Sequence, residues 1–95
     1  MAYYVVQYLY VTDADLVAKT RPDHRAYLRT LVDAGTLKAS GPYVGTERDS
    51  ANLIFCAGSA AEVKQAIAAD PMSVEGALES FTVTEWNPIL GVFAS

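Results

Sequence analysis

Strand-like and helix-like runs follow one another along this chain in an order that few folds can accommodate. Tyr3 to Val11 is rich in tyrosine and valine and lacks helical spacing, so it predicts a strand. A helix is expected from Thr20, because Thr20 and Asp23 have capping-box spacing, and Gly35 is a natural C-terminal stop. The intervening Leu16 to Lys19 is expected to be a loop or a short helical turn.

Strand-like and helix-like runs continue through the rest of the chain. Ser59 and Glu62 form a capping box by spacing and residue type, and Asp70-Pro71 ends the helix that follows. The expected elements, in order, are strands over 37–43 and 51–57, a helix over 60–69 and a strand over 81–86. Residues 72–80 are expected to be connecting structure, and residues 87–95 an apolar tail.

The order strand-helix-strand-strand-helix-strand predicts an α+β, ferredoxin-like fold with an antiparallel sheet. Right-handed crossovers then give the spatial strand order 4-1-3-2, with the first and third strands in the centre. The 95 residues are enough for one domain and too few for two, so residues 1–95 are expected to form a single domain.

Both faces of the predicted central strands carry large apolar side chains. In the first strand Tyr4 and Tyr8 alternate with Val5 and Leu9, and Ile54 lies in the third strand. Helices can cover only one face of such a sheet, and a large exposed apolar patch normally marks an interface. The sequence therefore predicts a homodimer that pairs through the sheet face, unless the tyrosines simply tolerate half-exposure.

Charge and residue usage exclude several classes of partner. The net charge is −4 and the seven basic residues are scattered, which argues against nucleic acid. One cysteine, Cys56, and one histidine, His24, cannot build an ordinary nitrogen–sulfur zinc site within one chain, so we expect no metal and no cofactor. With no secretory signal, no membrane-length apolar run and no possible internal disulfide, the expected location is the cytoplasm.

Topology predicts which polar residues meet. His24 at the start of the first helix and Asp70 at the end of the second should lie at one end of the domain, which Ser40 and Tyr43 at a strand end also approach. Histidine is the residue type whose ordinary pKa lies near neutrality, and a His–Asp pair is a reasonable general acid/base. The alternative is a core histidine satisfied by a carboxylate or a backbone group.

Three residues around this end are candidate substrate-binding groups: Arg21, Ser40 and Tyr43. Arg21 is interpreted as an anion or carboxylate clamp at the mouth of a pocket, or as a solvated surface charge. Ser40 would bond a substrate oxygen, or else serve the Gly41-Pro42 turn. Arg25 and Arg29 are expected to point away from the apolar face of their helix.

Four short motifs, in this order and spacing, resemble the YciI-like, or YCII-related, family. They are Arg21-Pro22-Asp23-His24-Arg25-Ala26-Tyr27-Leu28, Ala34-Gly35-Thr36-Leu37, Ser40-Gly41-Pro42 and Asp70-Pro71. The resemblance covers essentially the whole chain. It implies a dimeric α/β barrel whose active site surrounds a His–Asp pair, roles that fall on His24 and Asp70, with Ser40 lining the pocket. A dehydrochlorinase of a chlorinated hydroxyquinol belongs to this family, and muconolactone isomerase shares the barrel.

Three functions agree with these residues and with the resemblance. The first is a cofactor-independent lyase or isomerase in which His24 moves a proton on a small cyclic or aromatic compound and Asp70 orients the ring. The second is a non-catalytic small-molecule-binding or accessory protein that uses the same cleft. The third is a metal-independent oxygenase of a related barrel type. Whether the chain is an enzyme at all is left open by the sequence.

Overall fold

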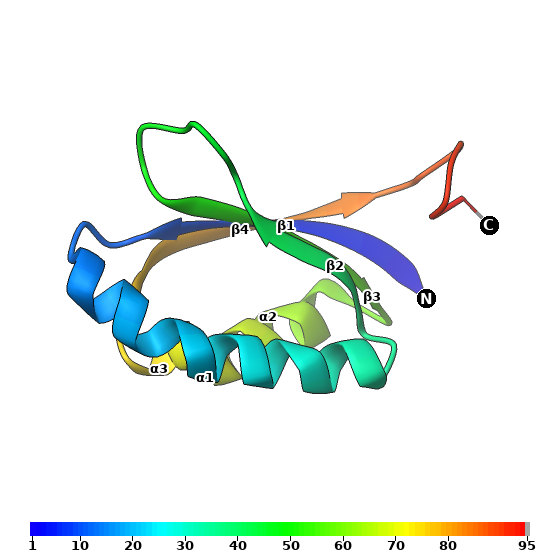
Figure 1. The fold of residues 1–95 in the computed structure, drawn as a ribbon. Coiled ribbons are helices and arrows are strands. Elements are labelled where there is room, and N and C mark those ends of the chain that lie inside the picture. The colour runs from blue at the N-terminus through cyan, green and yellow to red at the C-terminus, as the bar shows by residue number, and fades with distance from the viewer. Residues whose placement is uncertain (95) are drawn as a thin grey trace.

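A four-stranded antiparallel sheet forms one layer of the structure, and the helices cover one of its faces (Figure 1). The structure is a computed structural model that describes residues 1–94. Its elements are β1 (Ala2–Tyr10), α1 (Ala14–Asp33), β2 (Leu37–Pro42), β3 (Ser50–Ala57), α2 (Ala60–Ala69), α3 (Pro71–Val74) and β4 (Leu78–Trp86). The strand order β2-β3-β1-β4 is the predicted 4-1-3-2 read from the other edge, so the ferredoxin-like α+β prediction is confirmed.

Helix α1 is longer than the sequence predicted, because it begins at Ala14 and not near Thr20. Asp13 is its N-cap and accepts a hydrogen bond from the Leu16 backbone N–H at 3.2 Å. Thr20 lies inside the helix, where its hydroxyl donates to the Leu16 carbonyl at 2.8 Å. Val17, which is 2% exposed, packs into the core, and this burial favours the extra turn at the N-terminal end.

The segment after α2 is also more regular than predicted. Asp70 ends α2 and is the N-cap of α3, and Pro71 occupies the first turn of α3, where its missing N–H is tolerated. Gly76 follows with a φ of 74°, and β4 already begins at Leu78. The prediction of connecting structure over 72–80 was therefore wrong at both ends of that segment.

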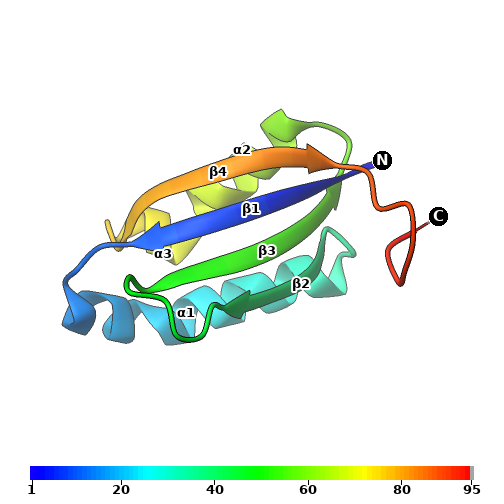
Figure 2. The ribbon, with the colours of Figure 1, turned by 90° about the horizontal axis from the view of Figure 1, so that it is seen from above.

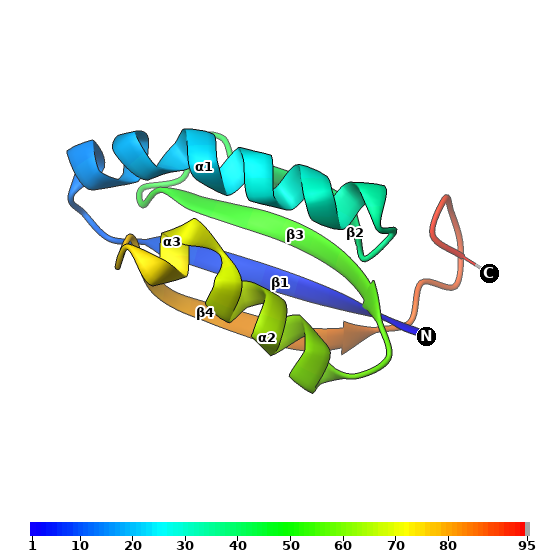
Figure 3. The same cartoon turned by 90° about the horizontal axis from the view of Figure 1, so that it is seen from below.

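The core lies between the sheet and the helices. Every second residue of β1 is buried there, and α1 and α2 lie next to each other across the same face of the sheet (Figure 3). Leu28 of α1 and Ile67 of α2 contribute to this core, and Met72 of α3 is completely buried. Burial of the central strands on this face therefore fixes where α1 and α3 sit, and with them the polar residues described below.

The opposite face of the sheet carries no helix, as the view from above shows (Figure 2). Residues 43–49, between β2 and β3, rise over this helix-free face (Figure 1). Val5 and Leu9 are half-buried on it and Ile54 is 7% exposed. Beyond β4, Phe93 lies against Tyr3 and Trp86, with ring centroids 5.8 and 6.2 Å away. Within residues 1–94 no helix has the length and apolar character needed to cross a bilayer.

Candidate active site

The structure brings His24 and Asp70 into direct contact, as the topology predicted. Nδ1 of His24 lies 2.9 Å from both carboxylate oxygens of Asp70. His24 comes from the middle of α1, and Asp70 from the junction of α2 and α3. The histidine is 6% exposed and the aspartate 0%, so water scarcely competes for this interaction.

Two further donors hold the Asp70 carboxylate in place. The Tyr8 hydroxyl donates to Oδ2 at 2.9 Å, and the backbone N–H of Met72 donates to Oδ1 at 2.9 Å. The Met72 bond is the capping interaction of α3, so the carboxylate direction is set by secondary structure. Because Asp70 accepts at Nδ1 of His24, that nitrogen carries the proton and Nε2 is the nitrogen free to exchange one.

The tyrosines beside this pair stay protonated well above neutral pH. Burial raises the pKa of Tyr8 far above its ordinary value, and the charge of Asp70 and the hydrogen bond to it raise it further. Burial, followed by the Asp70 charge, raises the pKa of Tyr10 to about 12, although the Arg21 guanidinium opposes the shift. Both hydroxyls therefore remain hydrogen-bond donors in the working range of most enzymes.

The raised pKa of Tyr10 predicts a loss of stability in alkali. The folded state favours the neutral phenol, so this stabilisation is complete below pH 10 and is lost as the pH rises towards 12. We expect Tyr10 to account for about 2 kcal/mol of lost unfolding free energy at pH 12. Denaturant titrations of the wild type and Tyr10→Phe from pH 8 to 12 measure it. A Tyr10→Phe profile parallel to that of the wild type would contradict the expectation.

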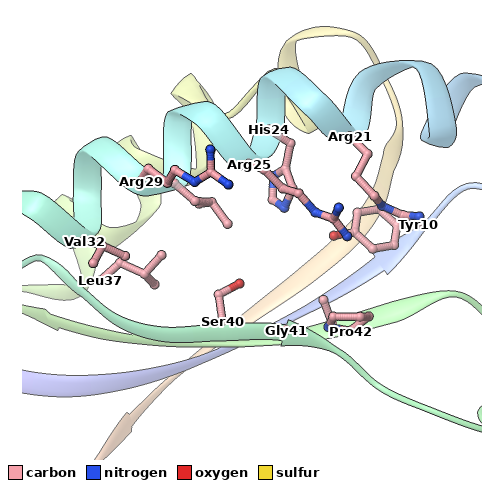
Figure 4. A pocket seen from close by; sticks show the side chains of 12 residues that line it. Tyr10, Arg21, His24, Arg25, Arg29, Val32, Leu37, Ser40, Gly41 and Pro42 are labelled. Carbon is pink, nitrogen blue, oxygen red and sulfur yellow. The ribbon is translucent and has the colours of Figure 1, made fainter.

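A cavity of about 340 Å³ lies between α1 and β2, and the His24 ring points into it (Figure 4). This volume suits a small molecule. Ser40 directs its hydroxyl into the cavity from β2, and the Tyr10 hydroxyl points into it from the end of β1 (Figure 4). Leu28 and Leu37 supply apolar lining. The cavity therefore combines an imidazole with a mainly apolar wall, an arrangement typical of small-molecule sites.

Arg21 stands at the edge of this cavity in a fixed position. Its Nη2 donates to Asp49 Oδ2 at 3.1 Å, and its guanidinium carbon lies 6.0 Å from the centroid of the Tyr10 ring. The carboxylate and the aromatic face together restrain a side chain that would otherwise be free to move. Arg21 and Ser40, two of the three residues predicted to bind substrate, therefore line the same cavity as His24.

The structure does not bring Tyr43 to this cavity. Pro42 pairs with Ala51 at the end of β2, and Tyr43 is the next residue. A step of one residue along a strand reverses the side-chain direction. Tyr43 instead lines a second cavity of about 400 Å³ on the helix-free face, together with Gln7 and Leu9. Chain topology correctly predicted the end of the sheet at which Tyr43 lies. The alternation of side chains along the strand puts Tyr43 on the helix-free face, away from His24.

Sequence analysis missed several residues of the site. Arg25 and Arg29 were expected to point away from the apolar face of their helix, and both are exposed, but both also border the cavity, which was not predicted. Their four-residue spacing from Arg21 was the available signal, because residues so spaced share one helix face. Tyr8 gave no separate signal, since its bond to Asp70 spans 62 positions of sequence. Among residues 1–94, no group of three or more His, Cys, Asp or Glu side chains is placed to hold a metal ion.

Comparison with known proteins places the chain in a family. A family model described as the YCII-related domain matches residues 1–87. The chain belongs to the YCII-related family. This agrees with the resemblance found in the sequence motifs. A search of curated proteins found no significant match to this YCII-related protein.

Among solved structures, this YCII-related protein is similar to the 5-chloro-2-hydroxyhydroquinone dehydrochlorinase of Burkholderia phenoliruptrix, in complex with 2,5-dihydroxybenzoquinone. The sequence identity is 20% and the TM-score is 0.78. The match covers 90% of this chain and 93% of the dehydrochlorinase chain. At this level of identity the comparison establishes a shared fold.

Proposed function

We propose that this YCII-related protein is a cofactor-independent lyase or isomerase that transfers a proton on a small cyclic or aromatic compound. The observation that carries the proposal is the buried contact between His24 and Asp70, with the imidazole directed into a cavity. In this reaction His24 is the acid/base and Asp70 positions it. The dehydrochlorinase that shares the fold supports a reaction of the lyase type.

The arrangement suits proton transfer at Nε2 of His24. Asp70 fixes the tautomer through Nδ1 and would stabilise the imidazolium that forms when Nε2 takes a proton. In the loss of HCl from the keto tautomer of a chlorinated hydroxyquinol, Nε2 takes the proton of a ring hydroxyl and the electron pair of that O–H bond forms a C=O bond. The ring double bonds shift in turn, and the electron pair of the broken C–Cl bond leaves on chloride. A positioned acid/base contributes roughly 10²–10⁴-fold, so binding by Arg21 and Ser40 would have to supply part of the remaining acceleration.

The test is the reaction of a chlorinated hydroxyquinol and of a dihydroxybenzoquinone with the full chain. Chloride release is measured with 5-chloro-2-hydroxyhydroquinone, and exchange of ring hydrogens with solvent deuterium is followed by NMR with 2,5-dihydroxybenzoquinone. We expect rates above the protein-free reaction for at least one of these processes, unchanged after dialysis against EDTA. Equal rates with the wild type and a His24 variant would contradict the assignment of His24.

A second function is favoured by the structural connections of the same pair. Through Asp70, His24 is linked to Tyr8 of β1 and to the N-terminus of α3, so the pair also joins three elements of the core. In a non-catalytic small-molecule-binding protein, the His24–Asp70 pair would serve only to hold these three elements together. This function predicts that the cavity binds 2,5-dihydroxybenzoquinone while neither chloride release nor deuterium exchange is accelerated.

We further propose that two copies pair through the helix-free face of the sheet. Val5 and Leu9 are only half-buried on this face, where no helix covers them, whereas Ile54 beside Val5 is already 7% exposed. Burying such side chains against a twin surface would remove apolar area from water on both chains. The interface would be isologous, with the two sheets packed face to face.

Val5→Lys is expected to convert the dimer to a monomer. Val5 lies on the central strand between Ile54 of β3 and Thr84 of β4, so a lysine there would bring a charge into the middle of the interface. We expect a loss of at least about 10-fold in dimer affinity, measured by sedimentation velocity over a range of concentrations. Lys64→Glu, an exposed change on α2, is the control. A wild-type monomer at high concentration would contradict the proposal.

A further inference from the structure

One face of α1 carries a row of arginines that borders the cavity. Arg21, Arg25 and Arg29 are spaced four residues apart, and all three line it (Figure 4). They are three of only four arginines in a chain with eleven acidic residues and a net charge of −4. Within residues 1–94, no acidic side chain lines this cavity. Positive charge is therefore concentrated here against the overall sign of the protein.

Helix stability does not explain the row. Like charges four residues apart weaken a helix. Arg21 has a counter-ion, since Asp49 lies 3.1 Å away. In the part of the chain that the structure describes, no carboxylate lies within ion-pair distance of Arg25 or Arg29. Two cations at the cavity thus lack an opposite charge from residues 1–94.

The other walls of the cavity restrict what could supply that charge. Leu28, Val32 and Leu37 form an apolar lining, and Ser40 adds one hydroxyl from the facing strand. A small inorganic anion would leave this apolar surface without a contact. A ring compound would cover it and could present an anionic substituent to the arginines.

We propose that the cavity selects ring compounds that carry a carboxylate or another planar, conjugated oxyanion, and that Arg25 and Arg29 bind this group. The proposal rests on the proposed function in taking this cavity as the substrate site. A guanidinium presents two parallel N–H donors that match the two oxygens of a planar anion. The ligand then supplies the counter-charge that Arg25 and Arg29 lack, while its ring lies beside His24.

Calorimetry with simple probes tests the selection without any turnover. Benzoate is compared with its neutral isostere benzamide, with 2,5-dihydroxybenzoquinone and with inorganic phosphate, all at low ionic strength. We expect the wild type to bind benzoate about 10-fold or more tightly than benzamide, and phosphate more weakly than benzoate. Of the two planar anions, the tighter binder identifies whether a carboxylate or a quinonoid oxyanion is preferred.

Two substitutions and a matched control locate the binding. Arg25→Gln and Arg29→Gln should each weaken benzoate binding about 5- to 20-fold and leave benzamide binding unchanged. Lys19→Gln removes the same charge from an exposed position of α1 that does not line the cavity, and should change benzoate affinity less than two-fold. Arg25 and Arg29 are exposed, so both variants should remain folded.

Several results would overturn the proposal. These are equal affinity for benzoate and benzamide, phosphate binding as tight as benzoate, no benzoate binding at millimolar concentration, or arginine variants that behave like Lys19→Gln. The outcome is separable from the proposed catalysis by His24→Asn, which removes Nε2 but leaves both arginines. If His24→Asn and the wild type bind benzoate equally and neither accelerates a reaction, anion selection stands and the proposed function fails.

Discussion

Replacing Asp70 with alanine is expected to lower the free energy of unfolding by about 3–5 kcal/mol. The carboxylate is fully buried and accepts hydrogen bonds from Tyr8, His24 and the Met72 backbone. Its removal leaves two buried side-chain donors unpaired and α3 without its cap. Equilibrium unfolding in denaturant at neutral pH measures the loss.

Two comparisons make the Asp70→Ala measurement specific. Asp23→Ala removes an exposed carboxylate from α1 and should change stability by less than about 0.5 kcal/mol. Asp70→Asn keeps a side-chain oxygen that can cap α3, so its loss should be smaller than that of Asp70→Ala. A loss below about 1 kcal/mol for Asp70→Ala would show that the carboxylate does not organise this part of the core.

Replacing His24 with asparagine is expected to reduce the rate of proton transfer roughly 10²–10⁴-fold. The asparagine amide can place an N–H near the position of Nδ1 and so keep a donor for Asp70, while Nε2 disappears. This change therefore separates the proposed acid/base role of His24 from its bond to the carboxylate. Deuterium exchange into 2,5-dihydroxybenzoquinone and chloride release from 5-chloro-2-hydroxyhydroquinone measure the rate.

Added imidazole provides an independent check on the His24→Asn result. A small base that enters the cavity should restore part of the lost rate, whereas a purely structural defect would not respond to it. Cooperative unfolding of the variant should show that it is folded, so that a lower rate cannot be attributed to a loss of structure. A His24→Asn rate within three-fold of the wild type would contradict a role for His24 in proton transfer.

The fold was predictable because its signals are local and agree with one another. Ser59 caps α2 as its spacing with Glu62 predicted, and Gly35 ends α1 with a φ of 80°. The start of α1 was mispredicted because two adequate caps compete, and capping alone does not distinguish Asp13 from Thr20. Packing of Val17 on the core decides between them, and that contact is tertiary.

The candidate site was predictable to the extent that topology determines it. Topology predicted that His24 and Asp70 lie at one end of the domain, and they do meet, although His24 lies in the middle of α1 and not at its start. Topology does not determine the side-chain direction at the end of a strand. Tyr43 is one residue beyond β2, and its side chain therefore lies on the other face of the sheet. The position of Arg25 at the cavity was missed for a related reason: the apolar stripe of a helix shows which residues face the core, but it does not reveal a cavity beside the core that neighbouring residues line.

Asp70 has two roles, as the partner of His24 and as the N-cap of α3, and this has a consequence for protein engineering. One carboxylate bonds the imidazole and also caps a turn of helix, so Asp70 belongs to the scaffold as much as to the candidate site. A designer who wished to graft a reaction into this cleft could vary Ser40 and the exposed arginines with little risk to folding, whereas any replacement for the buried His24 would have to keep a hydrogen-bond donor for Asp70. Asp70 would have to be kept, and any new group at position 24 would lie against its carboxylate.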